Sequence, residues 1–455
     1  MLFEENFEKK ALTNVALFDE KQIITYEKLF QKFRELNSFF QENENQLIII
    51  LCQNNIETVV CILAGLAHNA CIMLLRHDID KNRLKNIKSK FKSKSTIYFK
   101  NRKICFESDE RSNSIVSSNV NLLLETSGST GEPKFVMLSK AALLKNAQQI
   151  NERLNINSSN KVVLHLDVTY SYGFSLITSF FLAGASLGIN DFGFLDRRFW
   201  SFHEHHSVNY FAGVPSHYEM MLSMRILSKL PACLKTFTVA GGALSNDVKE
   251  KIFSDLDEND KSFFVMYGQT EAGPRMSVLE PSEFLKRPGS VGKALKDSMF
   301  FIDCDGKFVT GSEQKGEVVF QGSNIMSGYA KNHKDLLNAK QLTLLHTGDV
   351  GWLDHDNYLY IVGRMDRMVK INGRRVDLVG LETLLESNLG TRAACIKVSE
   401  GLKIFIESQN NSSLMVQNLL TKETKLTESQ VEIIYLPKLP LNTRGKIDYK
   451  DLENA

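Results

Sequence analysis

A loop of small, hydroxylated and basic residues follows a run of apolar residues near position 125. The apolar run 122–124 is typical of a buried strand, and the segment TSGSTGEPK begins at residue 126, after one glutamate. Glycines let backbone N–H groups converge on a phosphate, hydroxyls add donors, and a lysine supplies positive charge. The residues that could do so are Thr126, Ser127, Gly128, Ser129, Thr130, Gly131 and Lys134. A surface turn has a similar composition, but the preceding strand and the Pro-Lys pair favour a phosphate-binding loop that is not a Walker A loop.

Two further segments carry groups suited to a nucleotide. In the stretch 267–271, YGQTE, the ring of Tyr267 can stack on adenine, and the Glu271 carboxylate is a hard oxygen ligand for Mg²⁺. Gly241, Gly242 and Ala243 follow the strand-like segment TFTVA. Taken alone, each segment is also compatible with a strand end and a turn.

These segments resemble the motifs of the adenylate-forming (AMP-binding) superfamily. Its members include acyl- and aryl-CoA synthetases, the adenylation domains of peptide synthetases and firefly luciferase. TSGSTGEPK is similar to the family's phosphate loop, and MYGQTEAG (266–273) to its YGxTE motif. The segment 346–376 is similar to its TGD…GRxD…K…G block, and LPLNTRGKIDY (439–449) to its PxNxxGK motif. The matches span residues 122–449 in the family's order, and we expect a short stand-alone member.

The resemblance implies roles for individual residues in adenylation. Lys446 is the expected catalytic lysine, which would stabilise charge on the acyl oxygen and the phosphate. Thr270 would approach the α-phosphate, and Glu271 together with Thr130 would hold Mg²⁺. Besides the phosphate loop, the residues implied in nucleotide binding are Gly241, Gly242, Ala243, Tyr267, Gly268, Asp349 and Arg364.

The same resemblance implies a C-terminal domain that rotates between adenylation and thioester formation. Asp366 matches the hinge, and Lys370 and Gly373 match the face that serves thiol transfer. Basic residues gather in this segment, and they suit the phosphates of CoA as well as an acidic carrier protein. They are Arg364, Arg367, Lys370, Arg374 and Arg375.

The segment expected to border the acyl pocket departs from the family pattern. Tyr170 stands where many acyl-CoA synthetases have a gating histidine, and Ser171 stands where amino-acid-activating members have an aspartate. Because a buried substrate ammonium without a partner is costly, Ser171 argues against α-amino acids. Gly173 and Val214 are the other residues expected at this pocket. Phe135 follows the loop lysine, where the family usually has glycine.

Strand-like and helix-like segments alternate up to about residue 270, which indicates mostly parallel sheets packed with helices. From about residue 300, short strands joined by Asp/Gly turns indicate a small antiparallel, barrel-like part. We therefore expect an α/β protein with a large N-terminal AMP-binding domain (1–365). A small, mobile α+β domain (366–455) would carry Lys446.

Composition narrows the range of partners. The 455 residues include 55 Lys+Arg and 53 Asp+Glu, so a net charge of +2 gives no electrostatic reason to expect nucleic acid. Seven scattered cysteines form no CxxC pair, which predicts free thiols. With neither a signal core nor a span-length apolar stretch, we expect a cytoplasmic protein.

The sequence predicts an ATP-dependent carboxylate ligase that uses Mg²⁺. It would form an acyl-AMP and pyrophosphate, then transfer the acyl group to a pantetheine thiol of CoA or of an acyl carrier protein. Two alternatives stay open: an amino-acid adenylation enzyme that loads a carrier protein, and a catalytically reduced nucleotide-binding relative. A kinase or ordinary ATPase is disfavoured because the Walker A and kinase signatures are absent from the sequence.

Overall fold

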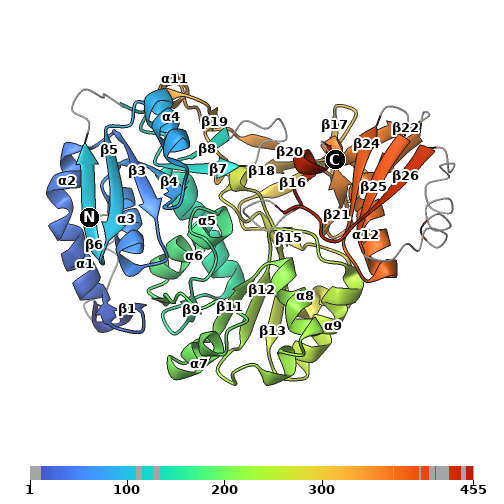
Figure 1. The fold of residues 1–455 in the computed structure, drawn as a ribbon, viewed down its shortest axis with the longest axis horizontal. Helices are drawn as coiled ribbons and strands as arrows, with labels where there is room; N and C mark the ends of the chain where they lie inside the picture. Colours follow the sequence, from blue (N-terminus) through green and yellow to red (C-terminus); the bar gives the residue numbers. More distant parts are fainter. Residues whose placement is uncertain are drawn as a thin grey trace. The chain divides into compact units, whose positions relative to one another are not determined.

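The computed structural model describes residues 12–108, 115–126, 134–371, 374–398, 401–408, 416, 430–441 and 447–453. The chain forms two compact units, and Figure 1 follows its course through both. Unit 1 combines Met1–Phe300 with Val319–Leu345, and unit 2 combines Phe301–Val318 with His346–Ala455. This division assigns the strands between residues 346 and 364 to unit 2, whereas the expected functional boundary lies at residue 365. That boundary stays a prediction.

The first sheet of unit 1 has seven strands in the order β19-β8-β7-β4-β3-β5-β6, and its four central strands are parallel. Its strands are β3 (Leu47–Cys52), β4 (Cys71–Arg76), β5 (Ser95–Lys100), β6 (Lys103–Ser108), β7 (Leu122–Thr126), β8 (Lys134–Leu138) and β19 (Tyr329–Ala330). Strand β3 reads LIIILC because both of its faces are covered, so no polar face is needed.

The second sheet of unit 1 has nine strands in the order β15-β14-β13-β12-β11-β9-β10-β1-β2. The six strands from β13 to β1 run parallel. The strands are β1 (Val15–Phe18), β2 (Ile23–Thr25), β9 (Lys161–Val163), β10 (Ser186–Gly188), β11 (Tyr210–Gly213), β12 (Thr236–Val239), β13 (Ser262–Tyr267), β14 (Ser277–Leu279) and β15 (Lys293–Ala294).

Helices of unit 1 connect these parallel strands, and most begin at a side-chain cap. Asn55 caps α3 and Ser139 caps α5, each by accepting a backbone N–H, which satisfies a donor that the first turn leaves free. The helices are α1 (Tyr26–Glu35), α2 (Asn37–Glu42), α3 (Ile56–Ala67), α4 (Lys81–Phe91), α5 (Lys140–Leu154), α6 (Ser171–Leu182), α7 (Arg197–His205), α8 (Pro215–Ser223), α9 (Asn246–Asp257), α10 (Pro281–Phe284) and α11 (His333–Leu337). The predicted alternation of strands and helices is confirmed.

Unit 2 is built largely from antiparallel strands. A five-stranded sheet has the order β17-β16-β18-β20-β21, and three of its strands, β16, β18 and β20, have residues in both units. Its strands are β16 (Met299–Cys304), β17 (Lys307–Val309), β18 (Gly316–Gln321), β20 (Leu344–Leu353) and β21 (Leu359–Arg364). The predicted change to short antiparallel strands near residue 300 is confirmed.

The C-terminal part of unit 2 has two small sheets and two described helices. Strands β22 (Met368–Ile371) and β23 (Arg374–Asp377) form a hairpin, and β24 (Ala393–Val398), β25 (Gly401–Glu407) and β26 (Val431–Leu436) form a second sheet. Helix α12 (Leu378–Leu389) packs with one face of this second sheet, where Leu381 and Leu385 join Cys395 in a core. On the other face, Phe405 packs with Leu439 and with Leu452, which lies on α14 (Tyr449–Glu453).

Two smaller predictions can also be compared with the fold. All seven cysteines are free thiols, as expected. Among the described residues, no helix has both the length and the apolar character needed to cross a membrane.

Candidate active site

The two ends of the predicted phosphate loop lie side by side in unit 1. Thr126 is the last residue of β7 and Lys134 the first of β8, and these two residues pair in the antiparallel ladder. The Thr126 hydroxyl also donates to the Lys134 carbonyl oxygen at 3.5 Å. The predicted contacts Ser127, Gly128, Ser129, Thr130 and Gly131 lie outside the described residues. The structure therefore describes the base of the loop, a closed hairpin.

Phe135, which follows the loop lysine, belongs to the core. It is 1% exposed, pairs with Ala330 of β19 and lies edge-on to Phe91, with ring centroids 5.2 Å apart. This departure from the expected glycine thus lets β8 contribute an aromatic side chain to the packing under α4.

The segment 267–271 turns sharply where β13 ends. A side chain at Gly268 could not fit, because its Cβ atom would lie 1.7 Å from the carbonyl oxygen of Pro274. The turn continues into a short 3₁₀ helix, Thr270–Ala272, which carries both predicted catalytic residues of this segment. The Thr270 hydroxyl donates to Ser171 Oγ at 2.9 Å, so the turn touches the first residue of α6.

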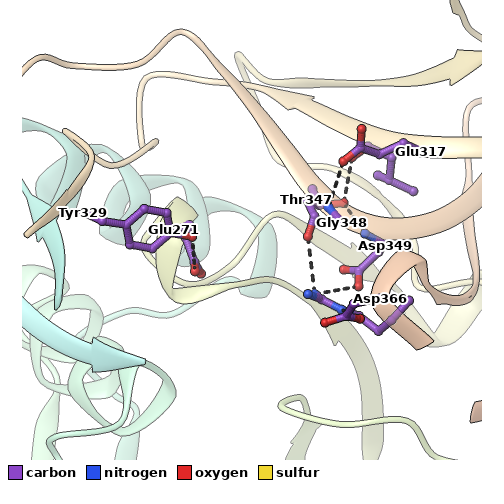
Figure 2. Close-up of polar contacts among 9 residues, drawn as sticks. Glu271, Glu317, Tyr329, Thr347, Gly348, Asp349 and Asp366 are labelled. Atoms are coloured by element: carbon purple, nitrogen blue, oxygen red, sulfur yellow. Dashed lines mark hydrogen bonds and ion pairs between the residues drawn. The ribbon is translucent and has the colours of Figure 1, made fainter. Parts of the chain in front are cut away.

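A lysine, a tyrosine and a glutamate lie in contact around this turn. The Tyr329 hydroxyl donates to Glu271 Oε1 at 2.8 Å (Figure 2), and Lys134 Nζ lies 5.3 Å from the centroid of the Tyr329 ring. Among the described residues, no basic side chain forms an ion pair with Glu271. Within the described part of the chain, the Glu271 carboxylate thus has a neutral donor, Tyr329, and no basic partner, a donor set that fits Mg²⁺.

The residues expected at the acyl pocket and the adenine-side loop are neighbours. Gly241 has a φ of +91°, and a Cβ atom there would lie 2.3 Å from the hydroxyl oxygen of Tyr170. Gly242 faces Pro215, the first residue of α8, and Val214 precedes it as the helix cap. Gly173 is also required sterically, since its Cβ atom would lie 2.3 Å from the Asp167 carbonyl oxygen. The Tyr170 hydroxyl therefore lies directly against Gly241.

Unit 2 holds the second group of predicted nucleotide contacts. Asp349 on β20 pairs in register with Arg364 on β21, and their side chains form an ion pair of 3.0 Å. Arg364 also donates to the Thr347 carbonyl oxygen at 3.3 Å and reaches Asp366 Oδ1 at 3.4 Å. Asp349 is only 5% exposed. The acceptor proposed for the ribose is thus held rigidly, while the guanidinium remains partly open to solvent.

The turn before Asp349 is braced by a residue that the motif does not contain. Glu317 on β18 accepts the Gly348 N–H at 3.1 Å and lies 2.8 Å from His346 Nδ1, as Figure 2 shows for Gly348. Gly348 itself has a φ of +69°, which favours glycine.

Burial opposes the charge of Arg364, but the carboxylates of Asp349 and Asp366 outweigh it and raise the pKa of the guanidinium.

Besides the phosphate loop, three further residues of the predicted set are only partly covered by the structure or not at all. Gly373 and Lys446 lie outside the described residues, and of Lys370 only the backbone, within β22, is described. The flanks of the lysine segment are described: Leu441 and Ile447 form an isolated antiparallel bridge, and the Asp448 N–H donates to the Pro440 carbonyl oxygen at 2.8 Å. The residue next to Lys446 therefore has a fixed place.

Arg275 is a further residue that the sequence did not single out. It is 2% exposed, and its guanidinium carbon lies 4.6 Å from the centroid of the Tyr172 ring on α6. It also donates to Ser175 Oγ and forms no ion pair with any described carboxylate. A buried cation with only neutral partners makes this side of α6 electropositive. No local pattern reveals Tyr329, Glu317 or Arg275, because each acts on residues far away in the chain.

A family model described as "AMP-binding enzyme" matches residues 100–330, just over half of the chain. The matched region includes the phosphate-loop hairpin, the turn at Glu271 and Tyr329. The chain belongs to the AMP-binding enzyme family.

Several curated proteins are similar in sequence. A probable CoA ligase, CCL9, of Humulus lupulus is 28% identical over 275 residues, covering 60% of this chain and 52% of that protein. An oxalate–CoA ligase of Arabidopsis thaliana is 27% identical over 268 residues, covering 58% and 52%. Gramicidin S synthase 2 of Brevibacillus brevis is 24% identical over 501 residues, covering 100% of this chain and 11% of the synthase. The chain thus spans about half the length, or less, of these relatives.

Solved structures share the fold over nearly the whole chain. The O-succinylbenzoate CoA synthetase MenE of Bacillus subtilis, in complex with AMP, has a TM-score of 0.81 at 19% identity, with 97% of this chain and 96% of that chain covered. MatB of Rhodopseudomonas palustris, with ATP bound, has a TM-score of 0.83 at 17% identity, with 100% and 97% covered. The predicted α/β fold with parallel and antiparallel sheets is confirmed.

Proposed function

We propose that the protein is an AMP-forming acid–thiol ligase that activates a carboxylic acid with ATP. The observation that carries the proposal is the Glu271 carboxylate. It is anchored by Tyr329, lacks a basic partner among the described side chains, and lies in one cluster with the lysine at the end of the phosphate loop. Family membership and the CoA ligases among the relatives support the same activity.

Each predicted site residue would have a definite task in this reaction. Lys134 and the phosphate-loop amides would bind the phosphates of ATP, while Asp349 would accept from ribose hydroxyls. Glu271 would hold Mg²⁺, which supplies charge neutralisation to the phosphate oxygens. Thr270 would orient the α-phosphate, and Lys446 would stabilise the charge that develops as the carboxylate oxygen attacks phosphorus and pyrophosphate leaves. MenE has been solved in complex with ATP and magnesium ion, in accord with this assignment.

The second half-reaction would transfer the acyl group from AMP to a pantetheine thiol. We propose that the acceptor is CoA or a carrier protein and that residues 366–455 rotate about Asp366, bringing the face with Lys370 and Gly373 to the acyl-AMP. The basic residues after Arg364 support an anionic acceptor of either kind. The free thiols support a reducing compartment such as the cytoplasm.

An amino-acid adenylation enzyme is the second candidate, favoured by the match of the whole chain to a peptide synthetase. Ser171 opposes it, because its hydroxyl accepts from Thr270 and offers no charge to a substrate ammonium. Carboxylates without an α-amino group therefore remain the proposed substrates.

Pyrophosphate release tests the proposal. The protein is incubated with ATP, Mg²⁺ and a panel of aliphatic, aromatic, dicarboxylic and α-amino acids, and AMP, ADP, phosphate and pyrophosphate are quantified. We expect AMP and pyrophosphate in equal amounts with at least one acid that lacks an α-amino group. ADP and phosphate as the products would overturn the assignment, and turnover of α-amino acids alone would establish the second candidate.

A further inference from the structure

A buried ion-pair network lies between the predicted hinge and the segment that carries Lys446. Glu382, in α12, is 6% exposed, and its carboxylate accepts three hydrogen bonds. Arg367 Nη2 donates to Oε1 at 2.5 Å, the Cys395 N–H donates to Oε1 at 2.6 Å, and the Tyr449 hydroxyl donates to Oε2 at 3.0 Å. All of these residues belong to unit 2.

The network also satisfies backbone groups at the edge of a sheet. Strand β24 is an edge of its three-stranded sheet, and the N–H and carbonyl of Cys395 are bonded to Glu382 and Arg367 rather than to another strand. Edge strands present unpaired backbone groups that need partners. The Arg367 guanidinium carbon lies 4.1 Å from the centroid of the Tyr449 ring, so the arginine and tyrosine also contact each other directly.

The network joins residues that lie close in the sequence to the predicted hinge and to Lys446. Arg367 comes directly after Asp366, the predicted hinge, and it ends the 3₁₀ turn Met365–Arg367. Tyr449 comes three residues after Lys446 and two after Ile447, which forms the bridge with Leu441. The Glu382 carboxylate therefore binds both Arg367, which follows the predicted hinge, and Tyr449, which lies close to Lys446 in the sequence.

We propose that Glu382 is a positioning residue for adenylation, which couples the hinge to the Lys446 segment so that both turn as one body. The inference rests on the proposed function for its kinetic consequences, but the coupling itself is a structural property. Glu382 touches neither substrate nor nucleotide in this account; it acts through Arg367 and Tyr449. Misplacing a catalytic group by about 1 Å can cost on the order of 100-fold in rate.

Burial of the carboxylate makes the coupling sensitive to the loss of a single partner. Burial raises the pKa of Glu382 to about 7, whereas Arg367, the Cys395 amide and Tyr449 favour the charged form. Removing one donor leaves a buried charge with one fewer partner, a change that is more costly than removal of an exposed pair. Tyr449→Phe removes only the hydroxyl and keeps the ring beside Arg367, so it is the mildest available test.

The experiment compares wild type, Tyr449→Phe and Glu382→Gln with Thr383→Val as the control. Thr383 follows Glu382 on α12, and its hydroxyl donates to the Val379 carbonyl oxygen within the helix. Each protein is assayed for acid-dependent ATP–pyrophosphate exchange and for thioester formation from synthetic acyl-AMP. Backbone hydrogen exchange is followed at residues 365–368 and 447–453, together with the melting temperature.

We expect Tyr449→Phe to lower the rate of pyrophosphate exchange about 10–100-fold, with the KM for ATP and acid within about two-fold of wild type. Thioester formation should stay within about two-fold, and hydrogen exchange should rise at both segments. Thr383→Val should behave as wild type. Equal losses in both half-reactions, in step with the melting temperature, would mean a purely structural role and overturn the proposal. Hydrogen exchange that is unchanged in Tyr449→Phe at residues 365–368 or at residues 447–453 would also overturn it.

Failure of the proposed function has a different signature. In that case the wild type would show no pyrophosphate exchange with any acid. The hydrogen-exchange comparison still decides the coupling, because it needs no substrate. Faster hydrogen exchange in Tyr449→Phe at both residues 365–368 and residues 447–453 would support the coupling. Faster hydrogen exchange at residues 447–453 alone would contradict it.

Discussion

At the scale of single residues, the site combines predicted groups with partners that only the fold reveals. YGQTE indicated Glu271 as a metal ligand, but nothing in its neighbourhood indicated Tyr329, which lies 58 residues away and donates to it. Likewise, Asp349 was expected from its TGD motif, whereas the brace from Glu317 to Gly348 spans 31 residues. Motifs predict the groups that meet ligands, because those groups are constrained by chemistry; their supports depend on the packing of distant strands.

The tyrosine support makes a graded prediction about Mg²⁺. Tyr329→Phe keeps the ring near Lys134 and removes only the donor to Glu271, so the apparent Mg²⁺ affinity should fall roughly 10–100-fold, as is typical when a ligand loses its outer partner. Glu271→Gln removes the charge that a hard cation prefers and should lose more. Titration of the adenylation rate with Mg²⁺ checks both, and excess Mg²⁺ should partly rescue each variant. Activity losses that no Mg²⁺ concentration alters would contradict the ligand role.

A buried histidine predicts acid lability of unit 1. His203 is 0% exposed, its Nδ1–H donates to the Phe199 carbonyl oxygen at 2.8 Å, and its Nε2 has no hydrogen-bond partner among the described residues. Burial lowers its pKa from 6.5 to about 4, so below pH 6.5 only the unfolded chain takes up the proton. Stability should therefore fall as the pH drops from 6.5 to 4, by up to about 1.4 kcal/mol per pH unit from this group.

Melting curves recorded from pH 7.5 to pH 4 check this dependence. In His203→Gln the group that titrates is gone, so the decline should be shallower by the share of one histidine. His165 and His217, whose pKa values burial also lowers, would keep the rest of the slope. An identical decline in the variant and the wild type would show that His203 does not titrate as its burial requires.

At the scale of elements, the apolar runs of the sequence predict the parallel strands well. LIIILC and CIMLL are buried on both faces in β3 and β4, so their composition alone identifies them. The sequence does not predict in the same way that some strands have residues in both units. Strands β16, β18 and β20 have residues in both units because of long-range pairing. The short alternating segments that form them do not indicate where a strand passes from one unit to the other.

The turn between β21 and β22 contains Asp366, the predicted hinge, and a substitution there tests the rotation. Asp366 lies in a 3₁₀ turn between these strands, and Asp366→Pro would fix φ near −65° and remove a backbone donor. If this turn absorbs the rotation, the variant should retain ATP–pyrophosphate exchange and lose transfer to CoA or a carrier protein. Both half-reactions are measured separately. Loss of adenylation alone would contradict the assigned direction, and a fall in both with the melting temperature would indicate misfolding.

At the scale of the whole molecule, the order of motifs along the chain predicted the family, and the family model and the folds of MenE and MatB agree with it. The predicted boundary at residue 365 rests on a resemblance that implies a rotation, whereas contacts group most of the antiparallel sheet with the C-terminal residues. A boundary of motion and a boundary of packing have different physical origins, and the motif at Asp366 predicts only the first.

The most direct test of the account is a comparison of the two half-reactions in wild type and Lys446→Ala. Loss of one charge aimed at the transition state costs about 2.7–4 kcal/mol, so acid-dependent ATP–pyrophosphate exchange should fall about 10²–10³-fold. Thioester formation from synthetic acyl-AMP should continue, and the melting temperature should be unchanged. Exchange near the wild-type rate in Lys446→Ala, or equal loss of both half-reactions in a folded protein, would contradict an AMP-forming ligase that works through this lysine.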